Sequence, residues 1–117
     1  MITSPGFYYF RQTSKRFDEC RITVLADHYS WIHLLFVKTD IKCDVSNEYI
    51  LFVDGIMFRE RYWPHGHNQK RIHSMCVIGA RQMIQMEQNA AQIFHRLYMN
   101  QGFTFYVNFV RQKTQRK

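Results

Sequence analysis

Apolar and polar residues alternate over several short segments, which is the pattern of strands that bury one face. The alternation predicts strands at Phe7–Gln12, Cys20–Ala26, Ser30–Lys38, Glu48–Val53, Ile56–Trp63 and Phe103–Arg111. Within the third segment, Trp31–Val37 is apolar at almost every position. That run is typical of a central strand covered on both faces, or covered on one face and paired with another subunit. We therefore expect an antiparallel sheet of five to six strands.

The dipeptide Asp54-Gly55 separates two of these segments and is a strong signal for a two-residue hairpin turn. Such a turn would pair Val53 with Ile56 and give the hairpin two distinct faces. The face expected in the core carries Tyr49, Leu51, Val53, Ile56, Phe58 and Tyr62. The opposite face carries Ile50, Phe52, Met57, Arg59, Arg61 and Trp63.

The period of the pattern changes between Cys76 and Asn100, where one long helix is predicted. Its apolar side would consist of Ala80, Met83, Ile84, Ala90, Ala91, Phe94, Leu97 and Tyr98. We expect an α+β fold, with the antiparallel sheet packed on this helix of about 76–100 and a strand after it. Residues 1–110 would form a single domain, and residues 111–117 a basic mobile tail.

Charge and aromatic content narrow the choice of partner. The chain has 16 Lys and Arg against 9 Asp and Glu, a formal charge of +7, which favours a polyanionic partner. Aromatic residues make up 16%, so rings are abundant enough to stack on bases beside those cations. The residues predicted to bind nucleic acid are Arg59, Arg61, Trp63, Lys70, Arg71, Arg11, Lys15 and Arg16. Alternatively, Trp63 and Phe52 pack under the helix, and the hairpin then has no exposed basic-aromatic face for bases to stack on.

The histidines His65, His67 and His73 suggest a metal site, because a His-x-His pair places two imidazoles on one side of an extended chain. Loops rich in Gly, Pro and His are more often solvated turns, so we expect no bound metal and no cofactor. We find no phosphate loop, catalytic carboxylate pair or nucleophile elbow, and therefore expect no enzymatic activity.

The order of elements around Arg59–Trp63 resembles the single-stranded DNA-binding domain of the positive cofactor four family of transcriptional coactivators. The similarity covers residues 20–97 at most and rests on Arg59–Trp63, the basic loop Gln69–Arg71, Ile72–Met75 and the long helix. It implies a homodimer formed by helix pairing, with sheets that make grooves for unpaired strands. Arg59, Arg61, Trp63, Lys70 and Arg71 would then be contact positions.

The sequence leads to one function and two rivals. The preferred function is non-enzymatic binding of single-stranded nucleic acid. The first rival is that the chain is a protein-interaction or structural assembly subunit, for example a viral one. That subunit would use the sheet edge and the Phe-rich last strand. The second rival is a metal-dependent single-strand nuclease that uses the His-x-His pair.

The location of the protein is predicted from its cysteines and its first residues. The cysteines Cys20, Cys43 and Cys76 are odd in number and show no pairing pattern, which predicts reduced thiols and a nuclear or cytoplasmic location. No signal peptide is visible, and no apolar run is long enough to span a membrane, so we expect no membrane among the partners.

Overall fold

The computed structural model describes residues 1–27, 29–41, 47–58, 61–63, 72–78 and 82–111, with only the backbone given at 58, 61–63, 77 and 78. These residues form strands and one short helix. The elements are β1 (Gly6–Arg11), β2 (Cys20–Leu25), β3 (Ser30–Thr39), β4 (Tyr49–Asp54), β5 (Ile56–Phe58), β6 (Arg61–Trp63), β7 (Ile72–Ser74), α1 (Met75–Ile78), β8 (Met83–Gln85), β9 (Ala90–Arg96) and β10 (Gly102–Arg111).

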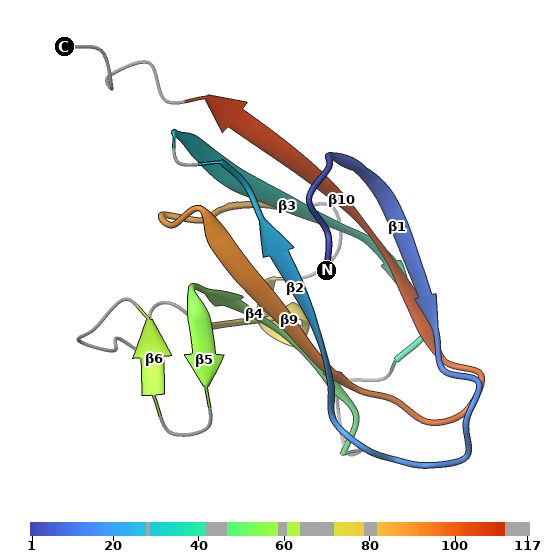
Figure 1. Ribbon diagram of the computed structural model, residues 1–117. Coiled ribbons are helices and arrows are strands. Elements are labelled where there is room, and N and C mark those ends of the chain that lie inside the picture. Colours follow the sequence, from blue (N-terminus) through green and yellow to red (C-terminus); the bar gives the residue numbers. More distant parts are fainter. Residues whose placement is uncertain (28, 42–46, 59–60, 64–71, 79–81, 112–117) are drawn as a thin grey trace, which may run out of the picture.

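The strands build two antiparallel sheets that pack face to face as a β-sandwich. The first sheet has the order β1-β10-β3-β8, and the second has the order β2-β9-β4-β7. Figure 1 shows them as two layers, with the short pair β5 and β6 projecting to one side. Neighbours in sequence are mostly not neighbours in a sheet, so the fold depends on long-range pairing.

The core lies between the inner faces of the two sheets. Phe36 on β3 and Phe52 on β4 are fully buried, and their ring centroids lie 5.9 Å apart across the sandwich. His95 on β9 meets Phe103 on β10 at 5.3 Å in the same way. Burying large rings from both sheets removes apolar surface from water, and this stabilises the contact between the layers.

The long helix predicted over about 76–100 is wrong, and the α+β class is wrong with it. In the described part of that range, α1 ends at Ile78, and the strands β8 and β9 follow. Strand β9 is buried on both faces over Ala90–His95. A strand buried on both faces has no period of two, so its apolar residues can be fitted to a helical period as well. The fold is all-β within the described residues apart from the one turn of α1.

A tertiary contact holds the chain between β8 and β9. The carboxylate of Asp54, at the end of β4, accepts hydrogen bonds from the backbone N–H groups of Glu87 at 2.7 Å and Gln88 at 3.0 Å. A local reading of residues 76–100 cannot include this partner, because it comes from more than thirty residues earlier. The contact satisfies two backbone donors at the turn that a continuous helix would have paired internally.

The predicted hairpin is also wrong. β4 pairs with β7 and β9, so Val53 lies opposite Ile72 and Gln92 and not opposite Ile56. The chain leaves the second sheet at Gly55, which has a φ of 128°, and β5 then pairs with β6. The single predicted strand Ile56–Trp63 is therefore two short strands that pair with each other.

The faces of β4 are the reverse of the predicted ones. Ile50 and Phe52 have no exposed surface, while Tyr49 and Leu51 are half-buried. The sequence YILFV is apolar at every position, so alternation could not decide which set of side chains points inward.

Five of the six predicted strands are present within one residue at either end, namely β1, β2, β3, β4 and β10. β3 lies between β10 and β8 in its sheet, which confirms the prediction of a central strand. The long helix that the coactivator resemblance implies is absent from the described part of 76–100.

Candidate binding face

The basic-aromatic surface predicted around the hairpin lies largely outside the described residues. Those outside are Arg59, His65, His67, Lys70 and Arg71, and for Arg61 and Trp63 on β6 only the backbone is described. Phe52, which was expected beside them, is fully buried in the core. The part of that surface contributed by β4 is therefore wrong.

His73 is the one predicted metal ligand in the described part of the chain. It lies on β7 opposite Phe52 and is half-buried. Among the described residues there is no group of three or more His, Cys, Asp or Glu side chains close enough to hold a metal ion. The described residues thus do not complete a group of three ligands around His73.

Of the N-terminal basic residues, Arg11 is the one that lies on a sheet. Arg11 ends β1 and donates a hydrogen bond from Nη1 to the hydroxyl of Tyr9 at 2.9 Å. Lys15 and Arg16 are exposed in the following loop, where Arg16 forms an ion pair with Asp18 at 2.9 Å. The N-terminal basic residues therefore divide into one sheet cation and two loop cations.

The outer face of the first sheet carries a continuous row of apolar side chains across all four strands. Register places Phe7 of β1 opposite Tyr106 of β10, Tyr106 opposite Leu35 of β3, and Leu35 opposite Met83 of β8. We call Phe7, Tyr106, Leu35 and Met83 the apolar row. Phe7 is 70% exposed and Met83 48% exposed, while Tyr106 and Leu35 are half-buried between them.

The rings of the apolar row touch each other. The centroids of Phe7 and Tyr106 lie 4.7 Å apart with an interplanar angle of 49°. Tilted aromatic pairs at this distance attract each other beyond their burial of area. The two rings therefore form one continuous aromatic surface across β1 and β10.

Polar side chains border the apolar row on both sides. On one side Tyr9, Thr104 and Lys38 lie opposite one another on β1, β10 and β3, and we call them the polar row. On the other side Asn108, His33 and Gln85 do the same on β10, β3 and β8. An apolar centre with a polar border is the arrangement found in protein interfaces.

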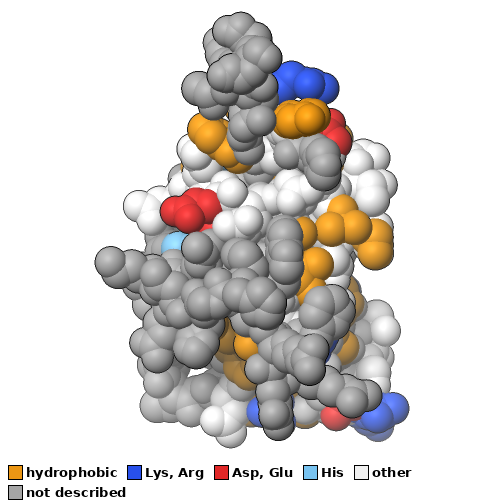
Figure 2. Space-filling model, turned by 60° about the vertical axis from the view of Figure 1, so that its left-hand side comes forward, with side chains coloured by type: hydrophobic (Ala, Val, Ile, Leu, Met, Phe, Trp, Pro, Cys, Tyr) orange, Lys and Arg blue, Asp and Glu red, His pale blue; other side chains and the backbone are white. Residues whose placement is uncertain are grey.

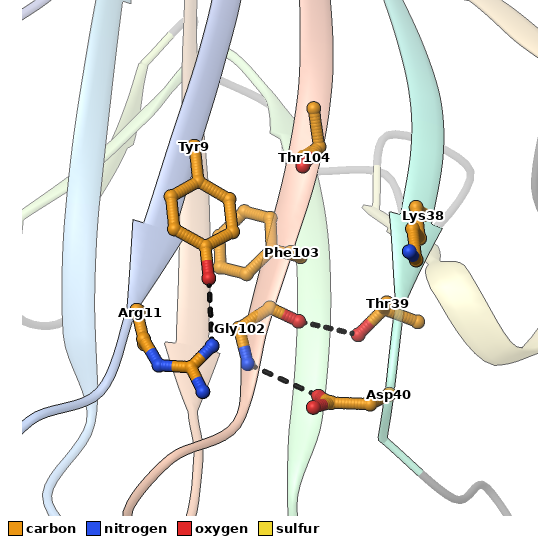
Figure 3. A pocket seen from close by; sticks show the side chains of 8 residues that line it. All are labelled: Tyr9, Arg11, Lys38, Thr39, Asp40, Gly102, Phe103 and Thr104. Atoms are coloured by element: carbon orange, nitrogen blue, oxygen red, sulfur yellow. Dashed lines mark hydrogen bonds between the residues drawn. The ribbon is translucent and has the colours of Figure 1, made fainter.

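A pocket of about 230 Å³ lies at the end of the polar row, where β1 and β3 end and β10 begins. It is lined by Tyr9, Arg11, Lys38, Thr39, Asp40, Gly102, Phe103 and Thr104, which Figure 3 shows. Gly102 is required at its base, because a Cβ there would lie 2.4 Å from the carbonyl oxygen of Phe10. The close approach of two backbones thus shapes the pocket.

Two neighbouring side chains act on the guanidinium of Arg11. The hydrogen bond to Tyr9 and, more weakly, the Asp40 carboxylate raise the pKa of Arg11 above its usual value. The hydrogen bond to Tyr9 also restricts the positions of the guanidinium, which lies beside Gly102 in Figure 3.

A second pocket, of about 340 Å³, lies on the outer face of the second sheet. It is lined by Glu19, Arg21, Leu51, Val53, Met57, Ile72 and Phe94. In the view of Figure 2, hydrophobic side chains reach the surface at several places. Single exposed apolar groups are ordinary on proteins, so the continuity of the apolar row sets it apart.

Sequence reasoning missed the apolar row, although two of its strands held the signal. In GFYYFR the alternation of Phe7, Tyr9 and Arg11 against Tyr8 and Phe10 gives the outward set, and the structure exposes it. Tyr106 likewise alternates with its buried neighbours on β10. Met83 could not be found, because its segment was assigned to a helix.

The cysteines differ from one another in the structure. Cys20 on β2 is free and exposed, whereas Cys76 in α1 is disulfide-bonded, so the expectation of reduced thiols is wrong for Cys76. Cys43 lies outside the described residues.

Within the described residues, no helix has the length and apolar character needed to cross a membrane. No protein-family model matches this chain, and no curated protein matches its sequence.

Proposed function

We propose that this chain is a non-enzymatic protein-interaction module that binds a partner protein through the outer face of the first sheet. The observation that carries the proposal is the apolar row, which crosses all four strands and presents Phe7 and Met83 to solvent. Large exposed apolar patches with a polar border mark interaction sites on soluble domains.

The central strand of this face supports the same proposal. Trp31, Leu35 and Val37 point outward from β3 and are only half-buried, and His33 is the one polar side chain among the outward positions from Trp31 to Val37. A strand in the middle of a sheet that faces water on one side would normally alternate with polar residues. Outward-facing apolar residues on such a strand are explained if a partner covers the face.

The disulfide at Cys76 bears on where such a partner is met. Disulfides persist in oxidising compartments and are rare in the cytosol and nucleus. The bond therefore favours an oxidising environment for the interaction over the reducing location expected from the sequence.

The test is a selection of displayed random peptides on the intact chain, followed by binding measurements on variants. Peptides that compete for one site should lose at least about tenfold in affinity on Phe7→Ser with Met83→Ser, because truncated interface anchors cost more than about 1 kcal/mol. Met99→Ser is the matched control, since Met99 is 43% exposed and lies outside the sheets.

Two results separate the proposal from chance binding. Retained affinity on Met99→Ser, with loss on the double variant, supports the face. Equal affinity of every selected peptide for the wild type and for the double variant would overturn the proposal.

Binding of single-stranded nucleic acid remains a second candidate, favoured by one specific observation. The rings of Phe7, Tyr9 and Tyr106 lie on the same face as Arg11 and Lys38, which is the combination that stacks bases and tracks phosphates.

The nucleic-acid candidate is tested by titrating oligo-dT at several salt concentrations. It predicts that Arg11→Gln with Lys38→Gln weakens binding and flattens the salt dependence. Arg59→Ala with Arg61→Ala tests the originally predicted surface in the same assay. No binding at low salt would exclude this candidate.

The homodimer and the metal-dependent nuclease also stay predictions. Sedimentation over a range of concentrations tests the first. Nicking of single-stranded DNA that requires a divalent metal and is lost in His65→Ala tests the second.

A further inference from the structure

We infer that the pocket beside the polar row holds one acidic side chain of the partner protein, a carboxylate of aspartate or glutamate. This inference rests on the proposed function, because it names a chemical group that the partner brings to the outer face. It is carried by the placement of Arg11 and Lys38 in one pocket that is continuous with the rows above.

The base of the pocket is held by hydrogen bonds across two strand ends. Thr39 Oγ1 donates to the carbonyl oxygen of Gly102 at 2.9 Å, and the N–H of Gly102 donates to Asp40 Oδ1 at 3.0 Å. These bonds hold Asp40 against the backbone of β10, as Figure 3 shows. The one carboxylate of the pocket therefore already has a donor.

The charges of the pocket favour an anion. Arg11 and Lys38 contribute two positive charges against the single negative charge of Asp40, and they come from different strands. Figure 3 shows Arg11 and Lys38 on opposite sides of Gly102. A carboxylate between them would gain hydrogen bonds assisted by charge from both sides, and such bonds are stronger than neutral ones.

Arg11 is held in position before any ligand arrives. Its Nη1 already donates to the hydroxyl of Tyr9 at 2.9 Å, and a guanidinium carries five N–H donors in all. The remaining donors are therefore presented in a restricted orientation. Binding then costs less side-chain entropy than it would with a freely moving arginine.

The size of the pocket points to a side chain and not to a whole free ligand. At about 230 Å³ it is smaller than the roughly 300–1,000 Å³ typical of pockets for complete small molecules. Tyr9 and Thr104 belong both to the pocket and to the polar row. A partner that covers the apolar row would thus place a neighbouring side chain into the pocket.

The first experiment titrates a blocked amino acid into the intact, isotopically labelled chain and follows the amide signals by NMR. The probe is N-acetyl-glutamate N-methylamide, and its neutral control is N-acetyl-glutamine N-methylamide. We expect shifts at Gly102 and Thr104 with the acid and not with the amide. Arg11→Gln with Lys38→Gln should abolish these shifts.

A charge-matched variant excludes a general effect of net charge. Lys15→Gln with Arg16→Gln removes the same two charges from an exposed loop away from the pocket, and it should leave the shifts unchanged. Equal shifts with the glutamine compound would overturn the inference, as would shifts that persist in Arg11→Gln with Lys38→Gln. Inorganic phosphate is titrated as well, and binding of phosphate without binding of the glutamate probe would also overturn it.

The second experiment separates this inference from the proposed function. In each selected peptide, an acidic residue is replaced by its amide. The loss should be at least about tenfold on the wild type and absent on Arg11→Gln with Lys38→Gln, as expected for two groups that interact directly. Peptides that need Phe7 and Met83 but tolerate every such replacement would overturn the pocket and leave the face intact. Suppose instead that the glutamate probe binds in the pocket while the peptides bind equally well without Phe7 and Met83. That result would overturn the proposed binding face and leave the pocket inference intact.

Discussion

Large apolar side chains reach the outer faces of both sheets, and within the described part of the chain neighbouring side chains cover part of those on the second sheet. On the second sheet, Arg21 lies over the ring of Phe94 with its Cζ 4.8 Å from the centroid, and Phe94 is 8% exposed. Arg96 lies over Phe17 at 4.6 Å in the same manner. On the first sheet, Phe7 is 70% exposed and its ring contact is with another side chain of the same face.

Hydrogen bonds between side chains and the backbone extend the cover on the second sheet. The N–H of Met57 donates to Gln92 Oε1 at 2.8 Å, and Arg21 Nη1 donates to the carbonyl oxygen of Met57 at 3.2 Å. The segment after β4 is thereby attached to the outside of β9 and β2. The difference teaches that an excursion of the chain covers part of the second sheet, whereas Phe7 and Met83 of the first sheet stay exposed in the described structure.

The largest expected effect tests which face of a strand is core. Phe52→Ala should lower the free energy of unfolding by about 3–5 kcal/mol, because it leaves a cavity between the sheets. Phe7→Ala, on the open face, should change it by no more than about 0.5 kcal/mol. Urea unfolding followed by circular dichroism measures both.

The paired design of these two variants makes the result decisive. A small effect of Phe52→Ala would mean that β4 turns the other face inward, as the sequence first suggested. A large effect of Phe7→Ala would mean that the outer face of the first sheet is already covered within this chain.

The second largest effect concerns the buried side chain of His95, which should make the free energy of unfolding depend on pH. His95 points inward from β9, its Nδ1 has no hydrogen-bond partner among the described residues, and its ring lies 4.3 Å from that of Phe10. Burial lowers the pKa of His95 from 6.5 to about 4, opposed weakly by Glu19. The unfolded chain therefore binds a proton between these values that the folded chain does not.

The stability that depends on neutral His95 should accordingly be fully present above pH 6.5 and should be lost as the pH falls toward 4. The loss that His95 contributes is about 3 kcal/mol, because each unit of pKa difference corresponds to about 1.4 kcal/mol. Urea midpoints across this pH interval measure it. His95→Leu should flatten that part of the profile, and an unchanged slope in this variant would assign the pH dependence to other groups.

The smallest expected effect is a difference in stability between variants of two arginines, Arg21 on the second sheet and Arg11 on the first, each of which lies beside an aromatic ring. Arg21→Gln should destabilise the chain by about 1 kcal/mol, since it removes the cation from Phe94 and a hydrogen bond to Met57. Arg11→Gln should leave stability unchanged, because its guanidinium is exposed and its hydrogen bond to Tyr9 lies at the surface. Thermal unfolding compares them, and equal destabilisation would remove the distinction between a covered and an open face.

The sequence predicted individual strands well where outward and inward side chains alternate regularly. In β1 and β10 the alternation is regular, and both strands were placed within one residue at either end. Prediction failed where the residues show no period of two, because such a run gives no basis for choosing a face or an element type. β4 is apolar at every position from Tyr49 to Val53, and β9 is buried at every position from Ala90 to His95. The Asp54-Gly55 turn was misread for a related reason, since its local signal competes with pairing partners far away in sequence.

The candidate site was even less accessible to local reasoning. Arg11 was chosen from the sequence, and it does lie in a pocket, but Lys38 and Gly102 reach it from other parts of the chain. Cross-strand register, and not spacing along the chain, places Phe7, Tyr106, Leu35 and Met83 in one row.

By itself, the sequence determined a strand-rich, basic and aromatic chain, because alternation and composition act locally and need no partner. Only the tertiary structure decided that there are two sheets, which faces meet inside, and which apolar face stays open. Those outcomes depend on which strands pair over long distances, and many pairings of the same apolar strands satisfy the local pattern equally.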